Sequence, residues 1–90
     1  MNITKNLKNN KMNIQTIWKE IKSFNKKADN ETFYHLLPKL GYEFLDYKAI
    51  NSKSGIITRR KYLVISPSKR IETIVLGKTF NIISIISKNL

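Results

Sequence analysis

The chain has 90 residues, and 17 Lys and Arg against 6 Asp and Glu give it a net charge of +11. This length allows one domain with a small core. The charge opposes compact folding and favours a polyanionic partner, of which nucleic acid is the commonest kind. The absence of cysteine excludes disulfides and zinc-finger spacing, and no apolar run approaches the ~20 residues that span a bilayer. We therefore expect no membrane association, no metal or cofactor, and no small-molecule substrate.

Composition also suggests the organisation of the chain and its origin. Residues 1–13 are rich in Lys and Asn and lack the apolar segment of a secretory signal, so we expect a basic disordered arm. Residues 14–90 then form a single RNA-binding α+β domain. The abundance of Asn, Lys and Ile is typical of an AT-rich genome. We expect a protein made inside an organelle, a mitochondrion rather than a plastid, or in a bacterial cytoplasm.

The first predicted element is an amphipathic helix. Its apolar residues recur at i, i+3, i+4, i+7 and i+10, which is one helix face. They are Ile14, Ile17, Trp18, Ile21 and Phe24. Residues 17–24 also fit a half-buried strand, and the pattern alone leaves both open.

A second helix is predicted after Ala28. Asp29 or Asn30 is a suitable N-cap, and Gly41 closes the segment. Its apolar face consists of Phe33, Leu36, Leu37 and Leu40. Pro38 lacks a backbone donor and should bend or shorten the last turn. We expect this face to pack against a sheet.

Residues 42–66 predict an antiparallel pair of strands joined by the turn sequence NSKSG, residues 51–55. In the first strand, simple alternation places Phe44 and Asp46 on one side and Leu45 and Tyr47 on the other. Residues 67–76 fit either a short helix or a third strand. Residues 80–87, FNIISIIS, predict a last strand that is apolar on both faces and therefore central or well covered. The predicted fold is α+β: a small antiparallel sheet with one or two helices on one face and a basic hairpin extension.

The segment Thr58–Arg70, TRRKYLVISPSKR, contains all three arginines of the chain and no acid. Arginine holds phosphate with fixed, two-pronged geometry, whereas lysine acts as a diffuse countercharge. On a strand, Arg59 and Lys61 project to one face, and Arg60 and Tyr62 project to the other. The candidate RNA-binding residues are Lys53, Arg59, Arg60, Lys61, Tyr62, Ser68, Lys69 and Arg70. An edge strand protected by charge is the alternative explanation.

Several short motifs resemble ribosomal protein ten of the small subunit. They are IKSFN (residues 21–25), KLG (39–41), the basic strand that ends in Ser66-Pro67, the following Lys69-Arg70, and FNIISI (80–85). The resemblance covers roughly residues 17–86. The family's Gly-Pro-Ile-x-Leu-Pro-Thr loop is replaced by NSKSGIIT, and its C-terminal helix and strand are missing. The family also begins with a strand where periodicity favours a helix.

This resemblance implies a non-enzymatic, structural component of the small ribosomal subunit. Its expected partners are small-subunit ribosomal RNA, bound through the basic hairpin, and neighbouring proteins of the subunit head. Two other functions remain open. One is a small ribonuclease toxin that acts on messenger RNA at the ribosome, with Arg59, Arg60, Lys61 and Tyr62 as its candidate residues. The other is a basic adaptor in an acidic protein assembly.

Overall fold

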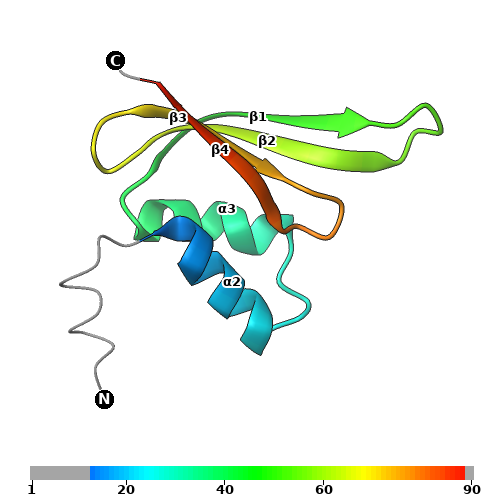
Figure 1. Ribbon diagram of the computed structural model, residues 1–90, viewed down its shortest axis with the longest axis horizontal. Coiled ribbons are helices and arrows are strands. Elements are labelled where there is room, and N and C mark those ends of the chain that lie inside the picture. Colours follow the sequence, from blue (N-terminus) through cyan, green and yellow to red (C-terminus); the bar gives the residue numbers. More distant parts are fainter. Residues whose placement is uncertain (1–12, 89–90) are drawn as a thin grey trace.

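Two helices precede a four-stranded sheet in the computed structural model, which describes residues 13–88 (Figure 1). The elements are α2 (Ile14–Phe24), α3 (Asn30–Lys39), β1 (Glu43–Asn51), β2 (Ile57–Ile65), β3 (Ile71–Leu76) and β4 (Ile82–Lys88). The strands form an antiparallel meander in the order β1-β2-β3-β4. Both helices lie on one face of it, and the β1–β2 hairpin extends beyond the other strands (Figure 1). The predicted α+β class is confirmed. The predicted arm, residues 1–13, lies outside the described residues apart from Asn13.

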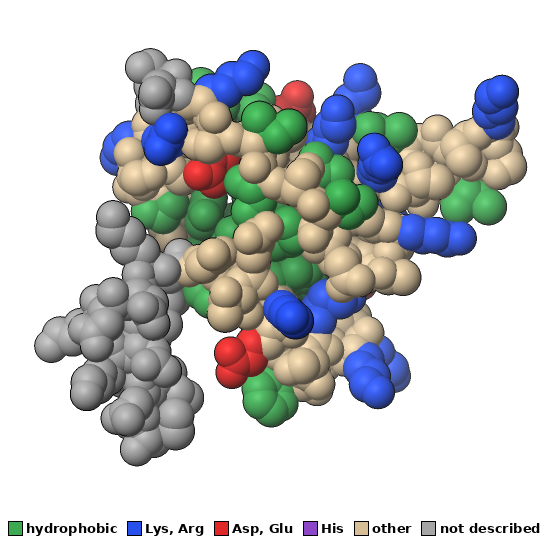
Figure 2. All heavy atoms as spheres, viewed as in Figure 1, with side chains coloured by type: hydrophobic (Ala, Val, Ile, Leu, Met, Phe, Trp, Pro, Cys, Tyr) green, Lys and Arg blue, Asp and Glu red, His purple; other side chains and the backbone are tan. Residues whose placement is uncertain are grey.

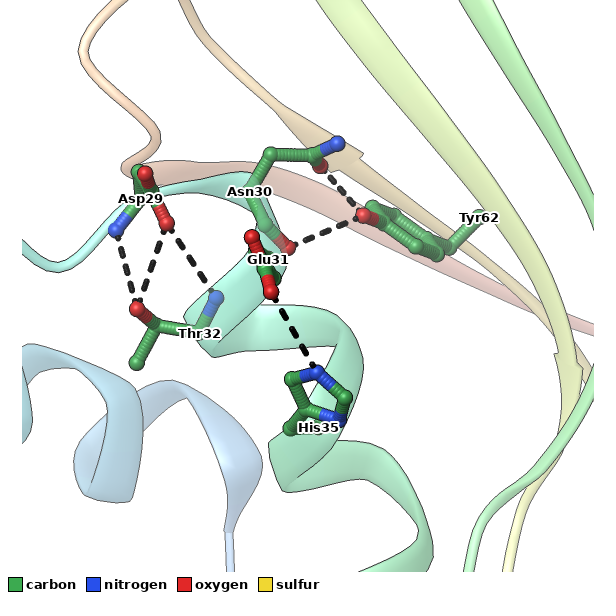
Figure 3. Close-up of polar contacts among 6 residues, drawn as sticks. All are labelled: Asp29, Asn30, Glu31, Thr32, His35 and Tyr62. Carbon is green, nitrogen blue, oxygen red and sulfur yellow. Dashed lines mark hydrogen bonds and ion pairs between the residues drawn. The ribbon is translucent and has the colours of Figure 1, made fainter.

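Both helices begin after a side chain that caps the first turn, and at the second helix the cap is Asp29, one of the two predicted residues. The Asn13 side chain accepts a hydrogen bond of 2.8 Å from the Gln15 backbone N–H. Asp29 and Thr32 form a reciprocal capping box at the start of α3, and these hydrogen bonds lower the pKa of Asp29 (Figure 3). Residues 14–24 are therefore helical. The strand that the ribosomal resemblance implies near residues 17–24 is not present there.

The core lies between the helices and the sheet. Trp18 of α2 meets Phe33 of α3 edge to face at 5.0 Å between ring centroids, and Phe33 meets Tyr62 of β2 at 5.2 Å. Leu37 and Val64 are also fully buried there. The predicted apolar face of the second helix does pack on the sheet. Phe24, the last residue of the first stripe, is 85% exposed and stays outside the core.

Two strand predictions were wrong. A β-bulge at Leu45 interrupts the alternation of β1, so that Phe44 and Tyr47 both lie on the helix side, opposite Val64 and Tyr62. The last strand, β4, is an edge strand with exposed isoleucines, not a central one. Residues 67–76, which fitted either a helix or a strand, consist of a turn followed by the strand β3.

All three hairpins turn in the same way. In each, the N–H of the first loop residue donates to the carbonyl four residues later, and the fourth residue has a positive φ. The positive-φ residues are Gly55 (85°), Lys69 (67°) and Phe80 (68°). Glycine adopts this conformation freely, whereas other residues are strained by about 1–3 kcal/mol. At Phe80 the strain is offset, because its carbonyl accepts a 2.6 Å hydrogen bond from Trp18 Nε1.

We predict that Leu37→Ala lowers the free energy of unfolding by about 2–5 kcal/mol, because Leu37 is fully buried beneath the sheet. The matched control is Leu45→Ala, whose side chain is 41% exposed at the bulge. Urea unfolding followed by circular dichroism measures both. Equal losses for the two variants would contradict this placement of the core.

Candidate nucleic-acid interface

Within residues 13–88, the helices leave the opposite face of the sheet uncovered (Figure 1). This face carries a row of cations, and we call it the basic face. Arg59 and Lys61 of β2 project to it, and Lys48 of β1 is the cross-strand partner of Lys61. All three side chains are exposed. Figure 2 shows basic side chains along the sheet and at the end of the β1–β2 hairpin. Lys53 lies in the turn of that hairpin.

The cations of the basic face have no partners of opposite charge within the described residues. The ion pair found in residues 13–88 joins His35 and Glu31 at 3.7 Å, on α3. Asp46, on the same face as Lys48, instead accepts a hydrogen bond of 2.8 Å from the Tyr47 N–H. Like charges directly opposite on neighbouring strands are destabilising. The pair Lys48–Lys61 therefore makes the basic face attractive to an anion.

An open groove of about 240 Å³ lies beside this pair. It is lined by Asp46, Tyr47, Lys48, Lys61, Leu63 and Thr73. Aliphatic side chains continue the face beyond the groove, among them Ile65, Ile71 and Ile86. The basic face thus combines cations that can contact phosphates with an apolar strip that can contact sugars and bases.

Arg60, predicted with Arg59, lies on the helix side of the sheet. Its guanidinium stacks over the Phe80 ring, 4.4 Å from the ring centroid. Its Nη1 is buried, and it has no hydrogen-bond partner within residues 13–88. The stacking geometry indicates a structural cation–π contact. Arg60 is therefore not part of the basic face.

Tyr62 also lies away from the basic face. It is 1% exposed, and its hydroxyl donates to the carbonyl and side-chain oxygens of Asn30 (Figure 3). Burial, and next the neighbouring Tyr47, raise the pKa of Tyr62. Stacking on a base or transferring a proton would require this residue to leave the core.

The remaining candidates lie in the β2–β3 turn. Ser68, Lys69 and Arg70 are exposed there, and the Ser66 and Ser68 hydroxyls are 2.9 Å apart. At roughly 3.3 Å per strand residue, this turn is about 20 Å from Arg59. The thirteen-residue basic segment is therefore divided into the basic face, the β2–β3 turn, and two residues that stabilise the core. Lys48 was missed by the sequence analysis, because only the hairpin register brings it opposite Lys61.

Residues 13–88 contain no group of three His, Asp or Glu side chains placed to hold a metal ion. Neither helix in that range is long and apolar enough to cross a bilayer. No protein-family model matches the chain, and no curated protein or solved structure is significantly similar to it.

We predict that Arg60→Gln lowers the free energy of unfolding by about 1 kcal/mol, because it removes the stacking on Phe80. Arg59→Gln should leave stability within about 0.5 kcal/mol of the parent, since Arg59 is exposed. Urea unfolding of both variants tests the division of the two arginines. A larger loss for Arg59→Gln than for Arg60→Gln would contradict it.

Proposed function

We propose that this protein binds structured RNA through the basic face and the β2–β3 turn, as a structural component of the small ribosomal subunit. The observation that carries this proposal is the exposed Lys48–Lys61 pair, with Arg59 beside it and no carboxylate paired to any of them within residues 13–88. A folded chain that keeps like charges opposite each other gains stability when a polyanion binds over them.

The arrangement suits a phosphate backbone better than a small anion. The cations of the basic face and those of the β2–β3 turn lie on the order of 20 Å apart, so a single phosphate cannot contact both. An extended or folded RNA strand can follow the sheet from the hairpin end to the turn. Recognition of this kind depends on shape and phosphates more than on base identity.

Strain at Lys69 gives independent support. This residue holds a positive φ of 67° in a turn position where glycine is the unstrained choice. Its side chain is exposed, so packing does not explain the lysine. Contact of its ammonium group with RNA provides a reason to keep a cation there despite the strain.

The ribosomal assignment is the finer part of the proposal. It rests on the short motifs that resemble ribosomal protein ten, although α2 occupies the place of that family's first strand. We propose small-subunit ribosomal RNA as the ligand, neighbouring proteins of the subunit head as further partners, and an organellar or bacterial ribosome as the location. Co-sedimentation of the native protein with small subunits, and not with large ones, tests this assignment.

A structural role fits the basic face better than ribonuclease activity does. The ribonuclease hypothesis assigns proton transfer to Tyr62, whose hydroxyl is held by Asn30 and whose pKa is raised by burial. Arg60, its candidate for charge stabilisation, is stacked on Phe80. Of its four candidates, Arg59 and Lys61 remain on the open face, where they can hold phosphate but are poorly suited to proton transfer.

We predict that Arg59→Gln/Lys61→Gln reduces the salt dependence of RNA binding by about half. If about four phosphates are neutralised, log affinity should fall with log salt at a slope of about −3, and each lost contact should reduce that slope by about 0.7–0.9. Fluorescence anisotropy with a labelled small-subunit RNA fragment, titrated at several salt concentrations, gives the slope.

The matched control is Lys26→Gln/Lys27→Gln, which removes the same charge from the exposed α2–α3 connection. This control should keep most of the slope. Equal losses from both double variants would show that net charge alone drives binding and would contradict the proposed face. Competition by polyglutamate as effective as competition by RNA would favour the acidic-assembly adaptor.

A further inference from the structure

A second surface, formed by α3 and β1, has the opposite character to the basic face. It contains a pocket of about 350 Å³ lined by Asn30, Glu31, Tyr34, Phe44, Tyr47 and Tyr62. We call this the aromatic pocket. Tyr34, Phe44 and Tyr47 are between 36% and 43% exposed. Aromatic side chains partly exposed around one hollow are typical of a binding surface.

The rings are arranged as walls around a shared space. Tyr34 and Phe44 meet edge to face at 5.1 Å between centroids, and Tyr47 and Tyr62 meet at 5.1 Å. Phe44 and Tyr62 are 6.2 Å apart. The Leu45 bulge creates this arrangement, because it turns both Phe44 and Tyr47 to the helix side of β1. Asn30, which also lines the pocket, accepts a hydrogen bond from the Tyr62 hydroxyl (Figure 3).

The charge around the aromatic pocket is inverted relative to the rest of the chain. Among the described residues, Glu31 is the one charged residue in the lining; its side chain is 81% exposed and its Oε1 lies 3.7 Å from His35 Nε2. Asp29 lies close to Glu31, at the N-cap of the same helix, whereas the two acids of β1, Glu43 and Asp46, project to the basic face. A phosphate-bearing ligand is repelled here, whereas a cation is attracted both by the carboxylates and by the ring faces.

The cations of the described chain do not fill the aromatic pocket. The cation–aromatic contacts within residues 13–88 join Lys22 to Trp18 and Phe80, and Arg60 to Phe80. These rings lie outside the pocket lining. Beside the pocket, β1 is an edge strand of the sheet. Its unpaired backbone groups can hydrogen-bond an extended segment while a side chain enters the pocket.

We propose that the aromatic pocket and the β1 edge form a docking site for a basic, extended segment of a protein partner, with an Arg or Lys side chain held between Tyr34, Phe44 and Tyr47. Charge complementarity favours this occupant over an unpaired nucleotide, and a short basic segment meets less repulsion than a second whole copy of a chain with a net charge of +11. The protein would then join RNA on the basic face to a basic protein segment at the aromatic pocket. The docking site does not depend on the RNA-binding proposal, since the two surfaces share no charged residue.

The test is binding of a short fluorescein-labelled Gly/Ser peptide carrying arginine, followed by anisotropy and compared with its glutamine analogue. The full chain should bind the arginine peptide at least about 10-fold more tightly. Glu31→Lys should weaken this binding by about 10-fold, and Tyr34→Leu, which keeps apolar area but removes the ring, by at least about 3-fold. Both residues are exposed, and circular dichroism confirms that the variants remain folded.

Matched controls separate the aromatic pocket from general effects. Glu20→Lys on α2 makes the same change in net charge as Glu31→Lys, and Phe24→Leu removes an aromatic ring that is 85% exposed. Both controls should bind the arginine peptide as the parent does. Equal binding of the two peptides, or equal losses in variants and controls, would overturn the proposal.

Two further results would assign the aromatic pocket to another occupant and would also overturn the proposal. One is binding of a short oligouridine that Tyr34→Leu abolishes. The other is a dimer, seen by analytical ultracentrifugation, that Tyr34→Leu dissociates. Structured-RNA binding should be retained in Tyr34→Leu, so failure of the docking site and failure of the RNA-binding proposal can be told apart.

Discussion

The alternation of side chains along β2 is the constraint on which the rest of the structure depends. Tyr62 on this strand contacts Phe33 of α3 and the Phe44 and Tyr47 rings of β1, and its hydroxyl anchors the start of α3 through Asn30. Once Tyr62 points toward the helices, the pleat directs Lys61 and Leu63 to the other face. The position of one buried ring therefore determines which cations remain free.

A chain of 90 residues has a small core, and within residues 13–88 the helices cover one face of the four-stranded sheet (Figure 1). Its two helices bury one face and leave the other to solvent, where exposed cations surround an aliphatic strip. A binding surface thus arises directly from the limited core. Three aromatic side chains, Tyr34, Phe44 and Tyr47, lie between α3 and β1, where they are only partly covered, and Glu31 of α3 lies beside them.

Local patterns in the sequence predicted much of this fold. The apolar stripe starting at Ile14, the Asp29 cap and the NSKSG turn correspond to observed elements, because each depends on neighbouring residues. Features that depend on distant pairing were not predictable in this way. The bulge at Leu45 depends on strand register, and the edge position of β4 depends on the order of strands in the sheet. The alternation of side chains along one strand predicts neither.

The candidate site shows the same division. Alternation correctly placed Arg59 and Lys61 on one face and Arg60 with Tyr62 on the other. Alternation could not show that Arg60 and Tyr62 stabilise the core. The ring on which Arg60 stacks belongs to Phe80, which lies twenty residues further along the chain. Glu31 and the aromatic residues near it were visible in the sequence, but only the fold brings Glu31 together with Tyr34 and Phe44 in the aromatic pocket.

The most direct test of the central claim, that the two faces of β2 have separate roles, is methyl NMR during titration with a structured small-subunit RNA. If RNA binds the open face, methyl signals of Leu63, Ile65 and Ile86, which lie on it, shift or broaden. Signals of Val64, Ile74 and Leu76, buried beneath the helices, should stay unchanged. Changes in the signals of the buried methyl groups, with no change in those of the open face, would contradict separate roles for the two faces of β2.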